Sequence, residues 1–296
     1  MGRSYTALVS RALVERYWRA QDPYDPATLG DVRHPAWSAE WPQSNERVPS
    51  HEADVAIHTA YSDYPAHALS RLAGSDEAWQ PIPAHLMFVP VRITGASDFW
   101  IGEAQLQYPQ QGLWHAVLLL ELREAQVWRE TAYFCRRLAD EPPSGTYPEP
   151  LPTPLPGIEA EMEHLDDAER RHRDAHARYV ELLATDPSAA VQHLFDENAV
   201  IDRPQHGRRV SGVAAIARAH EAQRELLPGR IRRVSASGHV VVVESLVHPS
   251  GPQSYRVDIL EFAGDKVVKG TEYFAEALPA PEWRRALVER TTEGAW

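Results

Sequence analysis

Two glutamates on predicted strands are the first candidates for acid–base chemistry. Glu103 and Glu244 occupy matched places in the two halves of the chain, each within a run of strand-forming residues. A glutamate that faces a protein interior can have a raised pKa and can then exchange protons near neutral pH. A strand glutamate is more often solvated or paired with arginine, so both interpretations stay open. His115, next to Trp114 on another predicted strand, is a further polar candidate.

Two histidines are spaced so that they could share a metal ion. His172 and His176 lie four residues apart on a helix predicted from Ile158 to about Ala184. The residues between them are Arg-Asp-Ala, which lacks the glutamate of the zinc-protease pattern, and the sequence offers no evident third ligand. Packing at a helix boundary explains both histidines. We therefore predict no metal and, since a phosphate-binding glycine loop is also missing, no cofactor.

Composition limits the class of partner. The formal net charge is −12 over 296 residues, which argues against a surface for nucleic-acid phosphates. The longest apolar runs, at 116–120 and 240–243, have the length of strands, whereas a membrane helix needs about 18 residues. The N-terminus lacks a signal-peptide core, and Cys135 stands alone, as is typical of a reducing cytosol. We predict a cytoplasmic protein, and the excess of arginine over lysine suggests a GC-rich bacterial genome.

A proline-rich segment divides the chain near its midpoint. Residues Glu141–Gly157 contain seven prolines, which exclude a helix interior or a central strand. Such a segment is typical of a semi-rigid linker. The sequence therefore predicts a first domain at 1–138, a linker at 139–157 and a second domain at 158–296.

The two domains are predicted to be copies of each other. Two segments recur at an offset of 162 residues and a third recurs at 140, so the first domain carries about 22 extra residues, in an insertion expected at about 51–97. The matched segments are Arg16-Tyr17 with Arg178-Tyr179, Glu40-Trp-Pro-Gln43 with Asp202-Arg-Pro-Gln205, and Thr131-Ala-Tyr-Phe134 with Thr271-Glu-Tyr-Phe274.

Each copy shows helices first and long strands afterwards. Leu13 and Tyr17 lie one turn apart in the opening helix, and a short second helix, a strand and a proline turn follow. This order predicts an α+β fold with helices covering one face of an antiparallel sheet. The strands are expected at 37–41, 99–107, 113–122 and 127–135 in the first copy, and at 199–203, 239–247, 254–262 and 266–276 in the second, with a helix at 213–226.

Several motifs resemble the SnoaL-like, or nuclear-transport-factor-2-like, family. They are Ala39-Glu-Trp-Pro-Gln43, Asp258-Ile-Leu-Glu-Phe262, Lys266-Val-Val-Lys-Gly-Thr-Glu-Tyr-Phe274 and Pro279-Ala-Pro-Glu-Trp-Arg284. The resemblance implies two tandem cone-shaped domains, each a curved sheet wrapped against helices around an apolar pocket. It also implies that the domains pair within the chain, and a further homodimer is open. The family includes ketosteroid isomerases, polyketide cyclases, epoxide hydrolases, dehydratases and non-catalytic binders, so fold alone leaves the function open.

The resemblance assigns two hydrogen-bond donors in the second copy. Tyr179 occupies the place of an oxyanion-binding tyrosine, and Asp258 that of a protonated second donor. Two such donors in a dry site stabilise an oxygen that becomes negative. Both residues also have a structural interpretation, as a buried ring and a common strand residue. The first copy keeps Tyr17 but has Leu118 in place of the aspartate.

The expected base is displaced by one residue. Family enzymes have a carboxylate immediately before the proline of the first strand, but here Trp41 and Arg203 occupy that place and Glu40 and Asp202 precede them. Because strand side chains alternate, this shift turns the carboxylates to the opposite face unless a bulge intervenes. They are bases if they enter the pocket and rim carboxylates otherwise.

We therefore predict an enzyme that applies acid–base chemistry to a small apolar metabolite, by isomerisation, cyclisation, dehydration or epoxide opening, in bacterial specialised metabolism. The alternative is a non-catalytic ligand-binding or assembly protein with one degenerate domain. The expected pocket residues are Trp41, Trp100, Trp114, His115 and Arg203.

Overall fold

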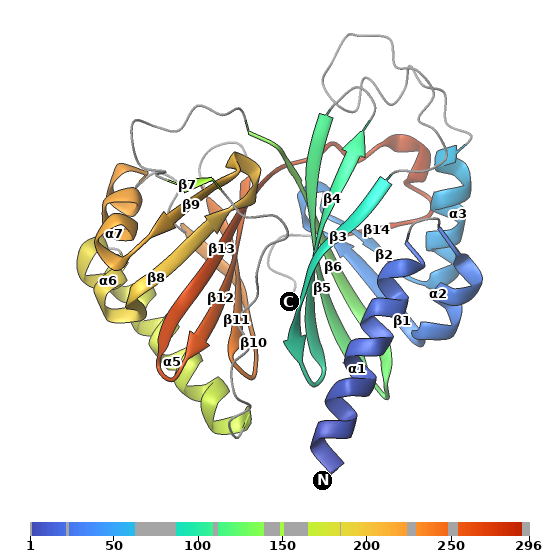
Figure 1. Ribbon diagram of the computed structural model, residues 1–296. Coiled ribbons are helices and arrows are strands. Elements are labelled where there is room, and N and C mark those ends of the chain that lie inside the picture. The colour runs from blue at the N-terminus through green and yellow to red at the C-terminus, as the bar shows by residue number, and fades with distance from the viewer. Residues whose placement is uncertain are drawn as a thin grey trace. The chain divides into compact units, whose positions relative to one another are not determined.

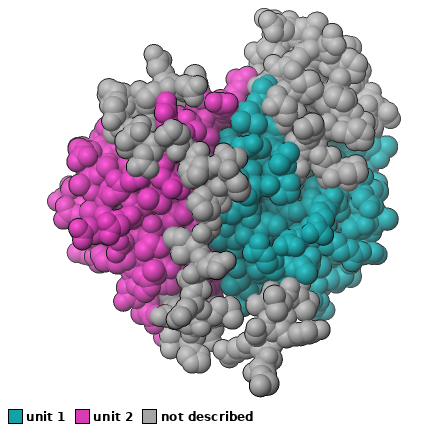
Figure 2. All heavy atoms as spheres, viewed as in Figure 1, with its two compact units in different colours: residues 1–134, 277–296 teal, residues 135–276 magenta. Residues whose placement is uncertain are grey.

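The computed structural model describes residues 2–21, 24–62, 87–108, 112–138, 149–150, 165–183, 185–223, 229–247 and 254–291. The chain forms two compact units, which Figure 2 colours separately. Unit 1 contains residues 1–134 and 277–296, and unit 2 contains residues 135–276. Among the described helices, none is both long and apolar enough to cross a membrane. Much of the expected insertion and most of the expected linker lie outside the described residues.

Unit 1 is an α+β unit built on one curved sheet (Figure 1). Its described strands follow the order β14-β2-β1-β6-β5-β4-β3, in which β1 and β6 run parallel. Side chains of its three described helices join one face of the sheet in a single hydrophobic core. The elements are α1 (Gly2–Arg19), α2 (Pro26–Val32), β1 (Arg33–Trp41), β2 (Glu46–Val48), α3 (His51–Ser62), β3 (Met87–Ala96), β4 (Phe99–Tyr108), β5 (Gly112–Arg123), β6 (Gln126–Arg136) and β14 (Glu289–Arg290).

Unit 2 repeats this plan, and the predicted α+β fold is confirmed in both halves. Its described strands follow the order β10-β11-β12-β13-β8-β9-β7, and β13 and β8 again run parallel. Its helices also pack on one sheet face. The elements are β7 (Glu149–Pro150), α5 (Leu165–Leu183), α6 (Pro187–Leu194), β8 (Phe195–Arg203), β9 (Arg208–Ser211), α7 (Val213–Ala222), β10 (Arg230–Ser237), β11 (Val240–Val247), β12 (Ser254–Ala263) and β13 (Lys266–Glu276).

Equivalent residues in the two units begin the short second helix and form the turn after the first strand. The side chains of Asp25 and Asp186 accept backbone N–H bonds at the start of the short second helix in each unit. The proline that follows β1 or β8 begins a single 3-10 turn. That turn closes on Asn45 at φ 53° and on Gly207 at φ 62°, a left-handed conformation that these two residue types tolerate.

The sheet of each unit includes a short strand from a segment that the sequence analysis placed outside that domain. Residues 277–296 follow β13, which is in unit 2, but belong to unit 1. There the Leu278 N–H donates to the Gln43 carbonyl at 2.8 Å, and β14 pairs with β2. In unit 2 the Leu138 N–H donates to the Gln205 carbonyl at 3.0 Å, and β7 pairs with β9. The sequence interpretation assigned 277–296 to the second domain and residues 149–150 to a linker, whereas β14 lies in the sheet of unit 1 and β7 lies in the sheet of unit 2.

Candidate functional site

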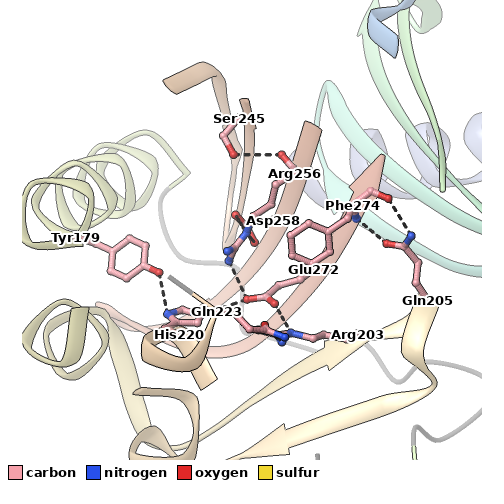
Figure 3. Close-up of polar contacts among 10 residues, drawn as sticks. All are labelled: Tyr179, Arg203, Gln205, His220, Gln223, Ser245, Arg256, Asp258, Glu272 and Phe274. Atoms are coloured by element: carbon pink, nitrogen blue, oxygen red, sulfur yellow. Dashed lines mark hydrogen bonds and ion pairs between the residues drawn. The ribbon is translucent and has the colours of Figure 1, made fainter. Parts of the chain in front are cut away.

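Unit 2 buries a cluster of charged and polar side chains between α5, α7 and one face of its sheet (Figure 3). Strand alternation explains the composition of this face. Arg256 and Asp258 are two residues apart on β12, so both lie on the same side of the sheet, and Arg203 and Glu272 join them from β8 and β13. The members, each less than a tenth exposed, are Tyr179, Arg203, His220, Gln223, Arg256, Asp258 and Glu272.

Glu272 is the centre of the cluster. Its carboxylate accepts a 2.5 Å bond from Arg203 Nε and a 2.8 Å bond from Arg256. Burial alone would raise the pKa of Glu272, but the two guanidinium groups hold it well below the ordinary value. Glu272 is therefore an anion, and Arg203 also donates to the Gln223 side-chain oxygen.

Asp258 has the opposite character. Arg256 Nε contacts both of its carboxylate oxygens, at 2.8 and 2.9 Å. Burial nevertheless raises the pKa of Asp258 to about 6, against the attraction of Arg256 and with a contribution from the negative Glu272. Two neighbouring carboxyls with pKa values pushed apart are typical of acid–base sites.

Tyr179, His220 and Glu272 form a hydrogen-bonded chain in which each donor points towards Glu272. The His220 ring contacts Glu272 Oε1 through Nε2 at 3.3 Å and the Tyr179 hydroxyl through Nδ1 at 3.4 Å. Burial lowers the pKa of His220, which favours the neutral ring, and burial raises the pKa of Tyr179. Because an ionised Glu272 can only accept, we assign the proton to Nε2, so Nδ1 accepts from the Tyr179 hydroxyl. The lone pairs of the Tyr179 oxygen are then left to accept a hydrogen bond.

The two carboxylates that precede the strand prolines do not join this cluster. Asp202 is fully buried, with Arg209 bonds at 2.6 and 3.0 Å and Lys269 at 3.7 Å, while its neighbour Arg203 lies in the Tyr179 cluster. Asp202 therefore lies on the sheet face opposite Arg203. Glu40 is buried in unit 1 and pairs with Arg47 in the β1–β2 register, as Asp202 pairs with Arg209.

The matched glutamates are paired with arginine. Glu103 accepts a short bond from Arg92. Glu244 accepts bonds from Arg232 at 2.8 Å and from Arg233 at 2.5 Å. In both units the arginine comes from the neighbouring strand β3 or β10, so the two pairs are equivalent.

The expected pocket residues of unit 1 lie on opposite faces of its sheet. Trp41, Trp100 and Trp114 all belong to the helix-facing hydrophobic core. The Arg284 guanidinium lies 4.7 Å from the ring centroid of Trp41. His115 is buried but adjoins Trp114 on the strand, so the two side chains take opposite faces.

The histidine pair on α5 is part of the packing of unit 2. His172 contacts the carbonyl oxygens of Gly238 at 3.1 Å and Gly264 at 3.0 Å, and stacks on Phe262 with ring centroids 4.2 Å apart. Burial lowers the pKa of His176 to about 4. Among the described residues, no three His, Cys, Asp or Glu side chains lie close enough together to hold a metal ion.

Tyr17 is part of a separate polar cluster in unit 1. Its hydroxyl donates to Glu130 through a short bond and accepts from Arg33 at 3.3 Å. Sequence reasoning found Tyr17, Tyr179, Arg203 and Asp258 but missed the residues that bond them. The available signal was charge at alternate positions of otherwise apolar strands, as in Arg256-Val-Asp258-Ile.

Part of the second half of the chain is similar to a known protein family. Residues 176–270 match the SnoaL-like domain family. The predicted resemblance is thereby confirmed for the second half, while the same character in the first half stays a prediction. A search of curated proteins found no match to the sequence.

Three solved structures illustrate the likeness of fold, and each covers less than half of this chain. An NTF-2 like protein from Burkholderia xenovorans LB400 is 28% identical, with 42% of this chain and 98% of that chain covered and a TM-score of 0.39. A proposed ketosteroid isomerase from Kribbella flavida is 23% identical, with 43% and 93% covered and a TM-score of 0.37. A proposed SnoaL-like polyketide cyclase from Jannaschia sp. CCS1 is 17% identical, with 45% and 90% covered and a TM-score of 0.34.

Proposed function

We propose that unit 2 is an acid–base catalyst for a small, largely apolar metabolite, of the isomerase or cyclase type. The observation that carries the proposal is the buried carboxyl of Asp258, with its pKa raised to about 6, in the same cluster as an ionised Glu272. A proton-transfer group is most effective when its pKa lies near the working pH. The SnoaL-like match over 176–270 supports the same reaction class.

The direction of the Tyr179 chain suggests which substrate group is engaged. Since the Tyr179 hydroxyl donates to His220, its oxygen is an acceptor for a substrate hydroxyl or enol. A proton can then pass from the substrate oxygen to Tyr179 while the Tyr179 proton passes to His220 Nδ1. Glu272 stabilises the imidazolium that results. Asp258 supplies or removes the second proton, so the reaction needs no external reductant or oxidant.

Deuterium exchange tests the proposal. The full chain is incubated with a panel of apolar hydroxyketones and epoxides in D2O, and the recovered compounds are analysed by mass spectrometry. We expect deuterium incorporation or turnover with at least one compound, and a loss of about 100-fold or more in Asp258→Asn, as for removal of a general acid–base group. Asp202→Asn is the matched control, because that buried carboxylate lies on the opposite sheet face.

A second candidate is non-catalytic ligand binding. The observation that favours it is the two-oxygen contact of Arg256 with Asp258, which leaves every charge of the cluster compensated within unit 2. Compounds that bind wild type and Asp258→Asn equally, without deuterium incorporation, would establish binding in place of catalysis.

We also propose that the first half is a second SnoaL-like copy. The support is the matched strand order of the two sheets and the parallel β1–β6 and β8–β13 pairs. Bacterial origin, cytoplasmic location, intrachain pairing and a homodimer stay predictions from the sequence.

A further inference from the structure

The polar cluster of unit 1 uses positions that are apolar in unit 2. The strand registers fix the equivalence, because Arg33 pairs with Val127 as Phe195 pairs with Val267. By the same offsets Arg33 replaces Phe195, Trp37 replaces Ala199, and Glu130 replaces Gly270. Conversely, Ala116, Leu118 and Ala132 stand where unit 2 has Arg256, Asp258 and Glu272.

These replacements show that the fold does not require the charges of unit 1. Unit 2 fills the three positions with a phenylalanine, an alanine and a glycine, and Ile201 and Phe195 pack against the glycine. Burying Arg33 and Glu130 instead carries a desolvation cost, so their presence calls for a reason other than folding. The first half therefore has its own polar site and is not a copy that has merely lost the aspartate.

The site is organised around one carboxyl group. Tyr17 donates to Oε2 of Glu130, and no described residue hydrogen-bonds Oε1. Arg33 holds the Tyr17 hydroxyl in this direction by donating to it at 3.3 Å. Arg33 also donates to Asp54 at 2.7 Å and to His51 Nδ1 at 2.9 Å, and these bonds fix the guanidinium.

Two buried N–H groups are without an acceptor among the described residues. They are Nε of Arg33 and Nε1 of Trp37, in residues that are 4% and 1% exposed. The guanidinium lies 3.7 Å from the ring centroid of Trp37, so both groups belong to one stacked pair. A buried donor without an acceptor has lost its bond to water without replacement, and a ligand oxygen can supply the missing acceptor.

We propose that unit 1 carries a second acid–base site, in which Glu130 exchanges a proton with a small, largely apolar ligand whose carbonyl or hydroxyl oxygen binds Arg33 and Trp37. The proton moves between the ligand and Oε1 of Glu130, and no other reactant is needed. Burial raises the pKa of Glu130, and negative Asp54 adds to this, while Arg33 and the Tyr17 hydroxyl oppose it. This proposal stands independently of catalysis in unit 2.

Labelling with N,N′-dicyclohexylcarbodiimide tests whether Glu130 is reachable and protonated. This apolar reagent adds whole to a protonated carboxyl and rearranges to a stable acylurea, which peptide mass mapping locates. With the native full chain we expect label on Glu130 at the acidic end of the pH range in which the chain stays folded, declining as the pH rises and its proton is lost. Glu103, held by Arg92, is the internal control and is expected to stay unlabelled.

Two variants serve as controls for the labelling experiment. Glu130→Gln must remove the label from this peptide, and Tyr17→Phe should move the labelling midpoint to higher pH, because the hydroxyl bond that favours the carboxylate is lost. Absence of label on Glu130 in folded protein overturns the proposal. Label on Glu130 without label on Asp258 supports it and counts only against the unit 2 site.

Protection by 2-acetylnaphthalene, a flat apolar ketone, tests the ligand class. We expect the ketone to slow labelling of Glu130 in wild type. Trp37→Phe should weaken that protection by about 2- to 10-fold, the value of one hydrogen bond, while keeping a ring under Arg33. No protection, or equal protection in the variant, overturns the assignment of Arg33 and Trp37 as the oxygen site.

Discussion

Asp258 should make the stability of the protein fall as the pH rises from about 4 to 6. Its pKa in the folded state is about 6, above the ordinary 3.8, so the folded state holds the proton more tightly. The stabilisation is complete below the unfolded pKa and is lost as the pH rises through the folded one. In denaturant titrations over this pH range, wild type should lose on the order of 3 kcal/mol more stability than Asp258→Asn, because the comparison isolates Asp258 from the other titrating groups. Equal pH profiles for the two proteins would contradict the raised pKa.

Glu272→Gln should lower the pKa of Asp258. The negative charge of Glu272 is one of the groups that raise it, and the variant leaves Arg203 and Arg256 with less negative charge nearby. We expect the carboxyl ¹³C titration of Asp258 to move below about 6, and His220 to lose the partner that fixes its tautomer. Asp202→Asn should leave the Asp258 midpoint in place. An upward shift in Glu272→Gln would show that lost hydrogen bonding outweighs the charge.

Single residues were predictable where a motif named them and missed where partners come from distant strands. The resemblance led to Tyr179 and Asp258, and strand alternation led to the separation of Asp202 from Arg203. No local pattern joins His220 on α7 to Glu272 on β13, because 52 residues separate them. The pairings depend on sheet register, which the sequence does not state.

Packing of α1 on β4 depends on the absence of a side chain at Gly102. A Cβ there would lie 1.6 Å from the Trp18 ring. Unit 2 has Val180 and Val243 at the two equivalent positions. Compared with unit 2, unit 1 therefore has a larger side chain on the helix and none on the strand. Gly102→Ala should lower the free energy of unfolding by about 1–3 kcal/mol or more through overpacking. Chemical denaturation measures the loss.

A double variant separates overpacking from a general intolerance of the strand. Trp18→Val with Gly102→Val recreates the unit 2 pair and should destabilise less than the sum of the single changes. Gly270→Ala, whose nearest contact would be Ile201 at 3.3 Å, is the control substitution at another strand glycine and should cost less than Gly102→Ala. Strict additivity would mean that the Trp18 contact does not set the cost.

Elements were predictable when both of their faces carry a clear pattern. The expected long strands correspond to β4, β5 and β6 and to β11, β12 and β13. Strands β3 and β10 were missed, and both lie at the edge of their sheets. Edge strands keep polar and even proline residues, such as Pro90 in β3, because one side needs no partner. Their register shifts further blur alternation.

At the scale of the whole chain, repeat offsets predicted two similar units but not which segments complete them. The 140-residue offset continues past the last long strand, so that Glu149 pairs with Arg209 as Glu289 pairs with Arg47. Proline density made the segment that contains β7 resemble a linker. A two-residue edge strand has too few residues to show periodicity.

Removing the C-terminal arm, residues 277–296, should therefore destabilise unit 1 selectively. A chain ending at Glu276 loses β14, the Trp283 packing and the Arg284 bonds to Glu46, whose side chain is fully buried. An uncompensated buried carboxylate costs about 3–5 kcal/mol. Hydrogen exchange measured by mass spectrometry should accelerate across 33–48, in β1 and β2, and change little across 195–211, in β8 and β9. Arg284→Met in the full chain should reproduce part of the effect. Acceleration confined to 195–211, or absent from both segments, would show that the arm does not stabilise unit 1.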